Sequence, residues 1–335
     1  MRQQRASMSS ARRDALTPEA LGMIDIIART GSFAAAAREM GKVPSALTYN
    51  VRQLEEALDV LLFDRSSRQA KLTAAGEALL EHGRHLLGEI DTLANRVRRV
   101  ATGWEANLTI AADGIVSRLT LLELVESFYS NCPREGAGTQ LRLRTEVLTG
   151  VWEALVTGQA DLAIGLTGDI APHKNIEMRP LGEVSFVFVV APHHPLAGLD
   201  EPLPDDVIQK HRAVAVADSA QRLAPATYNL LGGQDVLTVA SMQAKIEAVL
   251  RCLGCGFLPE SLVRTHIRNG LLVVKRVRRA SPRARMGYAW RADAVSKPRK
   301  PPHGLALQWW LKQLDSATTR QALLERHLGL PADVD

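Results

Sequence analysis

Residues 31–58 read GSFAAAAREMGKVPSALTYNVRQLEEAL, and the pattern of this segment predicts how the amino-terminal part of the chain folds. Ser32 can cap a short helix over residues 33–40, and Gly41 ends it. A second helix begins at Pro44, because proline fits the first position of a helix. At about 100° per residue, the apolar side chains of this helix share one face: Leu47, Val51, Leu54 and Leu58. The pattern predicts two helices joined by a tight turn.

The opposite face of the second helix carries hydrogen-bonding side chains: Ser45, Thr48, Tyr49 and Arg52, with Asn50 and Gln53 on the flanks. An earlier amphipathic helix, capped by Thr17 and ended by Gly31, completes a small core. In a helix-turn-helix, the second helix lies in the major groove of DNA, where polar side chains meet base edges and phosphates. The outward face is suited to that role.

Residues 61–72 read LLFDRSSRQAKL, with two short apolar anchors around a polar and basic tip. This pattern predicts a β-wing next to the second helix. Basic side chains there can neutralise phosphates, which fixes the register on the duplex but carries little sequence information. The residues expected to contact DNA are Ser32, Pro44, Ser45, Thr48, Tyr49, Arg52, Gln53, Arg65, Arg68 and Lys71.

Several short motifs occur in order within this region: GSFAAAAREM from Gly31, PSALT from Pro44, VRQLEEAL from Val51, LFDR from Leu62 and LTAAG from Leu72. Together they resemble the DNA-binding domain of LysR-type transcriptional regulators, closely over the amino-terminal third and more loosely beyond it. The resemblance implies a winged helix-turn-helix that binds DNA sequence-specifically.

The chain departs from that family at the start of the second helix. The family usually has Thr or Ser followed by Gln, whereas this chain has Val43 and Pro44. A capping hydroxyl and a base-reading amide are therefore missing, so the family's operator sequence does not carry over. Tyr49 can take part of that role.

A long helix is expected from Thr73, which can cap it, to Thr102. Its apolar residues recur at steps of four and three, with Gly83 in the skipped place: Leu79, Leu86, Ile90, Leu93, Val97 and Val100. A helix on the order of 45 Å long with so narrow a stripe needs a partner. Packing on the rest of its own chain is the alternative to dimerisation. The resemblance implies antiparallel pairing between subunits, in a homodimer or a homotetramer built as a dimer of dimers.

After Gly103, short apolar runs alternate with helical patterns. Strands are expected at 108–112, 141–148 and 161–165, with helices at 119–129 and 151–157. A second set covers 184–190, 213–216, 242–253 and 271–274, followed by 286–290 and a helix near 305–314. This alternation indicates parallel sheets with crossover helices. The expected fold class is α/β, with a two-lobed, periplasmic-binding-protein-like effector domain of the kind the resembled family carries.

Ligands of such sheets lie where the carboxyl ends of strands meet helix N-termini. Four loops lie at such positions, at 113–117, 149–150, 166–167 and 217–219. Residues near 242 and 256–259 can supply an apolar wall for the ligand. The residues expected to contact an effector are Asp113, Gly114, Ile115, Thr149, Leu166, Asp218, Met242, Phe257 and Pro259. Each can equally be an ordinary turn or core position. The expected ligand is a small aromatic or carboxylic metabolite.

The chain has 335 residues, of which 46% are hydrophobic and 23% charged, as in folded proteins of two or three domains. The expected division is a disordered basic arm at 1–16, the winged helix-turn-helix at 17–72, the linker helix at 73–103, the effector domain at 104–318 and a tail at 319–335. Lobe 1 covers about 104–183 and 286–318, and lobe 2 about 184–285. No apolar run reaches the roughly 20 residues of a membrane span, and the arm does not resemble a secretory signal. With only three cysteines, a cytoplasmic location is expected.

The net charge of +5 does not carry the argument for DNA binding. Residues 264–300 hold twelve basic residues against one acid, Asp293, so the rest of the chain is acidic. We interpret this cluster as a solvated basic face, and a dedicated anion site is the alternative.

Three further patterns are interpreted as structural. They are the pair Cys252 and Cys255, the pair His82 and His85, and the His193-His194 turn. No P-loop, nucleophile elbow, dinucleotide fingerprint or HExxH motif occurs, so no enzyme, cofactor or metal is expected. We expect an effector-switched LysR-type regulator whose partners are double-stranded operator DNA and, if it activates, RNA polymerase. The alternative is an α/β binding protein or enzyme whose first helices only oligomerise.

Overall fold

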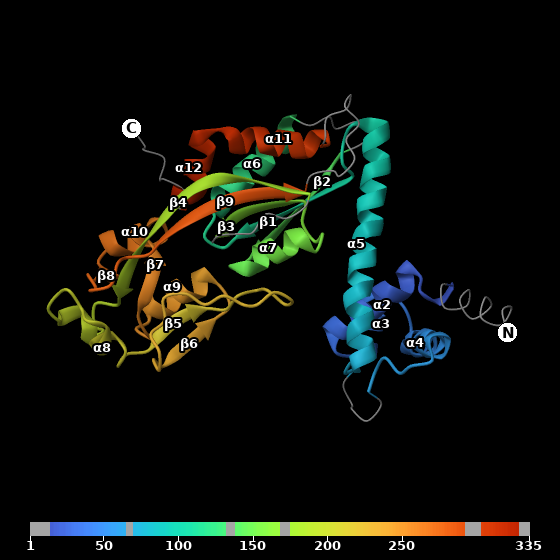
Figure 1. Ribbon diagram of the computed structural model, residues 1–335, viewed down its shortest axis with the longest axis horizontal. Coiled ribbons are helices and arrows are strands. Elements are labelled where there is room, and N and C mark those ends of the chain that lie inside the picture. The colour runs from blue at the N-terminus through green and yellow to red at the C-terminus, as the bar shows by residue number, and fades with distance from the viewer. Residues whose placement is uncertain (1–13, 65–69, 132–137, 168–174, 292–302, 328–335) are drawn as a thin grey trace. The chain divides into compact units, whose positions relative to one another are not determined.

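The computed structural model describes residues 14–64, 70–131, 138–167, 175–291 and 303–327 (Figure 1). The chain divides into two compact units, Met1–Ala94 and Asn95–Asp335. Each unit has its own apolar core. The expected mixture of a helical amino-terminal unit and an α/β unit is confirmed.

Helices α2 (Pro18–Thr30), α3 (Phe33–Glu39) and α4 (Pro44–Leu58) pack together in the first unit. The expected caps are present, since Thr17 Oγ1 accepts a hydrogen bond from the Ala20 amide at 3.1 Å and Ser32 Oγ accepts one from the Ala35 amide at 3.4 Å. Gly31 ends α2 in a left-handed conformation. The core beneath these helices is centred on Ile24, Ile27, Leu47 and Leu54.

Helix α5 (Ala74–Thr102) begins where the sequence predicts it. Thr73 Oγ1 accepts a hydrogen bond from the Gly76 amide at 3.1 Å and caps the helix. Gly76 allows the helix to lie against the preceding segment, because a Cβ atom there would be 2.1 Å from the carbonyl oxygen of Leu62. A side chain at position 76 would therefore displace either the helix or that segment.

A mixed sheet runs through the second unit in the order β2-β1-β3-β9-β4-β7, with β8 paired to β4. Its strands are β1 (Asn107–Asp113), β2 (Gln140–Glu146), β3 (Leu162–Thr167), β4 (Ile176–Val190), β7 (Gly256–Pro259), β8 (Val273–Val274) and β9 (Arg283–Arg291). Strand β1 is parallel to β2 and β3, whereas β9 is antiparallel to both β3 and β4. The prediction of parallel pairing is thus right for β1–β3. It is wrong for β9, which returns from lobe 2 in the opposite direction, and for β4, which pairs antiparallel with β7 and β8.

Strand β4 joins the two lobes and is much longer than the expected 184–190. Its first half pairs with β9, and its second half pairs with β7 and β8. Lobe 2 also contains the parallel pair β5 (Ala213–Val216) and β6 (Val236–Val239), which is linked to the main sheet by a bridge between Ala213 and Cys255. The sequence predicted β5 correctly but not β6 or β7.

Helices cover both faces of the lobe 1 sheet, as Figure 1 shows. Successive residues of a strand point to opposite faces, so Ile110 packs beneath α6 (Arg118–Asn131) and α11 (Leu305–Asp315), whereas Ala111 packs against α7 (Thr149–Val156). In lobe 2 the helical elements are η1 (Pro195–Gly198), α8 (Asp205–Ile208), α9 (Met242–Leu250) and α10 (Glu260–Arg268). Helix α9 ends three residues before the predicted end at Leu253.

The expected carboxy-terminal tail is wrong for its first part, because α12 (Ala317–Glu325) is a packed helix. Ser316 caps it, and Leu323 and Leu324 are buried in the same core as α6 and α11. The short apolar pair was too weak a periodic signal to indicate a helix from sequence alone.

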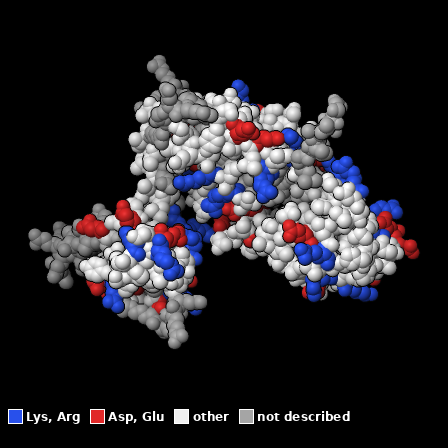
Figure 2. Space-filling model, turned by 180° about the vertical axis from the view of Figure 1, so that it is seen from behind, with Lys and Arg blue, Asp and Glu red and all other residues white. Residues whose placement is uncertain are grey.

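Acids from other segments pair with five of the twelve basic residues in the 264–300 cluster. Glu201 lies 2.8 Å from Arg276 and 3.5 Å from Lys275, and Glu325 lies 2.8 Å from Arg264. Asp205 and Glu183 likewise face Arg279 and Arg283. Figure 2 shows acidic side chains (red) next to basic ones (blue) on the surface of the second unit. The pairing favours a solvated, partly neutralised face over an anion site; residues 292–302 lie outside the described part.

His194 is buried, contrary to the simple surface turn expected for the His193-His194 pair. Its Nδ1 accepts a hydrogen bond from the Leu196 amide at 3.1 Å, and its ring lies against that of His211 with centroids 5.1 Å apart and the two planes tilted by 55°. Burial lowers the pKa of His194 below its ordinary value, helped by the charges of His211 and His193.

We therefore expect acid to destabilise lobe 2 through His194. The unfolded chain binds a proton at His194 more readily than the folded chain does. The stabilisation that neutral His194 contributes to lobe 2 is therefore fully present above the ordinary pKa of about 6.5, and it is lost as the pH falls through the lower pKa of the folded state. In His194→Asn, whose side chain can still accept the Leu196 hydrogen bond, hydrogen exchange of lobe 2 amides should depend less on pH between about 5 and 7. An unchanged pH dependence would contradict this assignment.

Candidate DNA-binding surface and effector site

Helix α4 has one buried and one exposed face, as the sequence predicts. Leu47, Val51 and Leu54 are buried in the core, and Leu58 packs against it. On the other side Ser45 and Arg52 are exposed, and Tyr49 has 62% of its surface exposed. These side chains therefore form an accessible row along α4, which a binding partner can contact.

Three of the other expected DNA contacts have local structural roles. Thr48 is half-buried and its hydroxyl donates to the carbonyl of Pro44 at 3.0 Å. The N-cap residue Val43 makes no side-chain cap, and Pro44 occupies the first turn, so the missing hydroxyl inferred from the sequence is a real difference. Ser32 caps α3. These contacts neither require nor exclude an approach to DNA.

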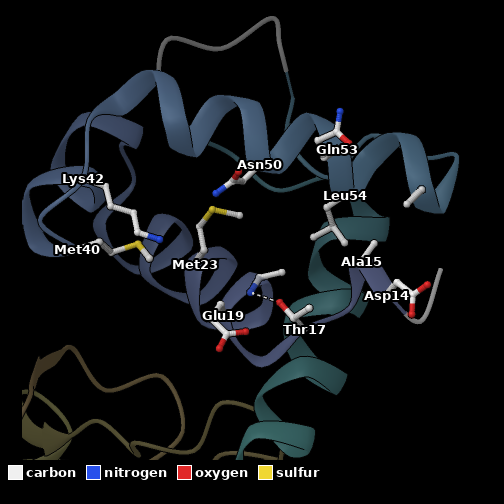
Figure 3. Close-up of a pocket in the computed structure, with 12 residues that line it drawn as sticks. Asp14, Ala15, Thr17, Glu19, Met23, Met40, Lys42, Asn50, Gln53 and Leu54 are labelled. Atoms are coloured by element: carbon white, nitrogen blue, oxygen red, sulfur yellow. Dashed lines mark hydrogen bonds between the residues drawn. The ribbon is translucent and has the colours of Figure 1, made fainter. Parts of the chain in front are cut away.

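A cavity of about 500 Å³ lies between the start of α2 and one flank of α4 (Figure 3). Asn50 and Gln53 line it together with Met23, Met40 and Lys42. Figure 3 shows Asn50 directed toward Met23. Asn50 therefore lies beside the exposed row and not within it, as expected for a flanking position, and Gln53 is exposed at the rim.

The wing begins and ends as predicted. Phe63 and Leu72 form an antiparallel bridge, and the Asp64 amide donates to the Lys71 carbonyl at 2.8 Å. Lys71 is exposed at its base. Arg65 and Arg68, the other two expected phosphate contacts, lie outside the described residues.

A buried glutamate, which the sequence reasoning missed, links α4 to the wing. Glu55 Oε1 accepts hydrogen bonds from the Leu62 amide at 2.8 Å and the Phe63 amide at 3.4 Å. A carboxylate on an otherwise apolar helix face was the available signal, because a buried charge needs such partners. Glu55 thus fixes where the wing begins relative to α4.

Four of the six expected dimerisation residues form an exposed apolar stripe on α5. Their exposed fractions lie between 45% and 64%: Leu86, Ile90, Leu93 and Val97. Leu79 does not belong to this stripe, because it packs against the core of the first unit. The Val100 side chain is outside the described part. Apolar residues exposed in a heptad pattern favour a partner helix over packing on the same chain.

The second unit brings polar groups together where β1 and β2 end. Asp113 is buried, and its carboxylate accepts hydrogen bonds from the Ile115 amide at 2.8 Å and the Leu148 amide at 3.0 Å. Burial raises the pKa of Asp113 to about 6, although these two amide bonds act in the opposite direction. Gly114 lies alongside, with its amide bonded to the Glu146 carbonyl at 3.1 Å.

Residues 147–150 form a tight turn that leads into α7. Leu148 has φ 53° and ψ −120°, and the Gly150 amide donates to the Val147 carbonyl at 3.0 Å. This is the geometry of a type II′ turn, whose first central position normally holds glycine. A leucine there is strained. The turn brings the amides of Leu148, Thr149 and Gly150 together at the entrance to α7, where each donates to an aspartate of the chain.

The loop after β5 meets this turn from lobe 2. Asp218 accepts hydrogen bonds from the Thr149 amide at 3.2 Å and the Gly150 amide at 3.1 Å. Burial opposes its ionisation, yet the amides of Ala226, Ala220 and Thr149 together hold the pKa of Asp218 below its ordinary value. Asp113, Thr149 and Asp218 are therefore adjacent, as expected for one site.

The apolar half of the predicted effector site is not supported. Ile115, Leu166, Phe257 and Pro259 are all buried in hydrophobic cores or in sheet pairing. Phe257 packs on Phe188 with ring centroids 5.3 Å apart. Leu166 was expected just after a strand but lies within β3, and Phe257 and Pro259, expected as an apolar wall, lie within β7. Ile115 follows β1, as expected, but its side chain is buried in the core of lobe 1. Met242 is half-buried and contacts the cores of both lobes.

Sequence reasoning missed Glu146 and Glu153, which meet the expected loops at the same place. Gly150 and Ser219 lie in the expected loops 149–150 and 217–219, but they were not among the residues expected to contact an effector. The cysteine pair, in contrast, is structural: Cys255 is buried, and burial raises the pKa of its thiol to about 11, the opposite of a reactive thiolate. Among the described residues, no group of three His, Cys, Asp or Glu side chains is placed to hold a metal ion.

Comparison with known proteins places both units in one family. Residues 18–77 match the bacterial regulatory helix-turn-helix protein, lysR family, and residues 101–318 match the LysR substrate binding domain. The chain is 39% identical over 308 residues to the probable HTH-type transcriptional regulator YhaJ of Escherichia coli strain K12, covering 91% of this chain and 97% of YhaJ. It is 33% identical to the HTH-type transcriptional regulator PunR of the same strain, over 94% and 98% of the two chains.

The crystal structure of CbnR, a LysR family transcriptional regulator, has the same fold. Its TM-score is 0.55 at 17% identity, over 90% of this chain and 99% of CbnR. Full-length CbnR has also been solved in complex with its target DNA.

The chain belongs to the LysR family of transcriptional regulators, and it is a DNA-binding regulator, not an enzyme. The alternative of an α/β enzyme with oligomerising helices is therefore set aside. Within the part of the chain that the structure describes, no helix has both the length and the apolar character needed to cross a membrane.

Proposed function

We propose that α4 reads operator DNA through Ser45, Thr48, Tyr49 and Arg52. The observation that carries this proposal is the exposed polar row opposite a buried apolar face. Ser32, Pro44 and Gln53 would border the contact, and Arg65, Arg68 and Lys71 of the wing would bind phosphates. Two such units, joined through the α5 stripe in a dimer or a tetramer, would span two half-sites.

We further infer that a small carboxylic or aromatic effector acts between the lobes, near Asp113, Gly114, Thr149, Asp218 and Met242. The adjacent polar groups of Asp113, Thr149 and Asp218 support a polar ligand at this junction. The proposed setting is the bacterial cytoplasm, and RNA polymerase would be a further partner if the protein activates transcription.

The DNA contact can be tested with duplexes that the wild-type protein selects from a random-sequence pool. Tyr49→Ala and Arg52→Ala should each weaken binding by about 1–3 kcal/mol, because each removes a groove contact and no core contact. Tyr228→Ala and Arg251→Ala, which change exposed residues of the other unit, are matched controls and should bind normally.

Binding should also weaken steeply with salt, since phosphate contacts release counterions. Unchanged affinity in both α4 variants would contradict the groove-facing assignment. Selection of no sequence at all would contradict the proposed function itself.

A further inference from the structure

We propose that residues 217–226 of lobe 2 form a latch that closes the two lobes on each other without an effector. The inference rests on the proposed effector function, because it concerns how that same junction is regulated. It is carried by contacts that lobe 2 makes with the turn before α7 and with α7 itself. The latch is defined by Asp218, Ser219 and the amides of residues 221–223.

The four amides of the 147–150 turn are already bonded to acceptors of the chain itself. Ser219 Oγ accepts from the Val147 amide at 2.9 Å, and Asp113 accepts from the Leu148 amide at 3.0 Å. Asp218 accepts from the two amides that follow. A helix N-terminus favours negative charge, and here lobe 2 supplies it. The groups that would attract an anion from solution are thus occupied by Asp218.

The latch is held from the opposite direction as well. Glu153, on the second turn of α7, accepts hydrogen bonds from the Gln221, Arg222 and Leu223 amides at between 2.7 and 3.1 Å. Despite the cost of burial, these bonds hold the pKa of Glu153 below its ordinary value. Each side of the junction therefore places a carboxylate on the backbone amides of the other side.

Two further features restrict the junction to this arrangement. The Ser219 hydroxyl donates to Glu146 Oε2 at 2.8 Å, and Arg144 holds the other oxygen of Glu146 at 2.8 Å. A Cβ atom on Gly150 would lie 1.9 Å from Ser219 Oγ, so only glycine permits this approach. The turn at 147–150 and the loop at 217–226 are thus shaped for each other.

Asp218 and a carboxylate effector would compete for the Thr149 and Gly150 amides, so the effector must first displace Asp218. Asp218 then also gives up its bonds to the Ala220 and Ala226 amides, unless the loop moves as a unit. Ligand binding and opening of the latch are then competing events. The switch would be a shift between a self-closed state and an opened, ligand-bound state.

The test uses the full chain, the variant Asp218→Ala and acetate, which carries the same carboxylate as the deleted side chain. The melting transition of the second unit should lie about 4–8 °C lower in the variant than in the wild type, because part-buried amides lose their acceptor. Hydrogen exchange at the amides of Thr149 and Gly150 should become about tenfold faster or more. Acetate should raise the melting temperature of the variant but not of the wild type, at matched ionic strength.

Asp235→Ala is the matched control, because Asp235 is an exposed aspartate of lobe 2 that pairs with Arg212. It should show neither faster exchange at the turn nor rescue by acetate. Equal acetate shifts in Asp218→Ala and the wild type, or unchanged exchange at Thr149 and Gly150, would overturn the latch.

If Asp218→Ala does not fold, Ser219→Ala tests the latch in its place. It should speed exchange of the Val147 amide, and unchanged exchange would overturn the latch. Operator binding by the wild type is measured in the same preparations. Normal binding together with a negative latch result refutes only the latch, whereas absent binding refutes the proposed function.

Discussion

Replacing Leu86 and Leu93 together by aspartate is expected to leave the protein monomeric and to weaken operator binding by about 10²–10⁴-fold, which is the advantage that linking two binding modules gives. Both leucines are more than half exposed on α5 and lie one heptad apart. In a helix pair they would face the partner in the apolar seam. An aspartate in this seam would have no oppositely charged partner. The free energy needed to bury its charge would exceed the stabilisation that the apolar seam provides.

Sedimentation of the purified double variant at micromolar concentration tests the first part of this prediction, and titration of the selected duplex tests the second. Leu271→Asp is a matched control, because Leu271 is a similarly exposed leucine on lobe 2 with 49% of its surface exposed. It should leave both the oligomer and DNA binding intact. Persistent dimers in the Leu86→Asp, Leu93→Asp variant would show that another surface holds the subunits together.

The first unit could be predicted almost completely from the sequence, because its signals are local. Thr17, Ser32 and Thr73 each accept the capping hydrogen bond that their positions indicate. The spacing of Leu47, Val51 and Leu54 identifies the buried face of α4 without reference to the rest of the chain. Caps and helical periodicity operate within four residues, which is the range that a single sequence displays directly.

The effector junction could be predicted only in part, because its contacts join segments about 70 residues apart. The sequence indicated Asp113, Thr149 and Asp218, since each follows a predicted strand. It could not indicate that Ser219 would meet Gly150 or that Glu153 would bind the amides of residues 221–223. The same rule placed Leu166 at the site, and there it failed because β3 extends through that residue.

The second large effect is expected at Glu55. Glu55→Ala should lower the free energy of opening of the first unit by about 2–4 kcal/mol, because it leaves the buried Leu62 and Phe63 amides without their acceptor. Hydrogen exchange at core amides such as Ile24 and Ile27 measures this free energy within the full chain. Unfolding of the whole chain would be less informative, since two units do not melt as one.

The Glu55 variant also separates stability from DNA recognition. If Glu55 positions the wing, its loss should reduce the salt dependence of operator binding, because Lys71 and its neighbours leave the phosphates, while the base preference of α4 is retained. Glu55→Gln keeps one acceptor oxygen, so it should lose less stability and less salt dependence of operator binding than Glu55→Ala does. Glu56→Ala, which changes an exposed neighbour, should retain both the stability and the salt dependence of the wild type. Equal losses in Glu55→Ala and Glu56→Ala would mean that the effect comes from charge on α4 and not from the buried bonds that join this helix to the wing.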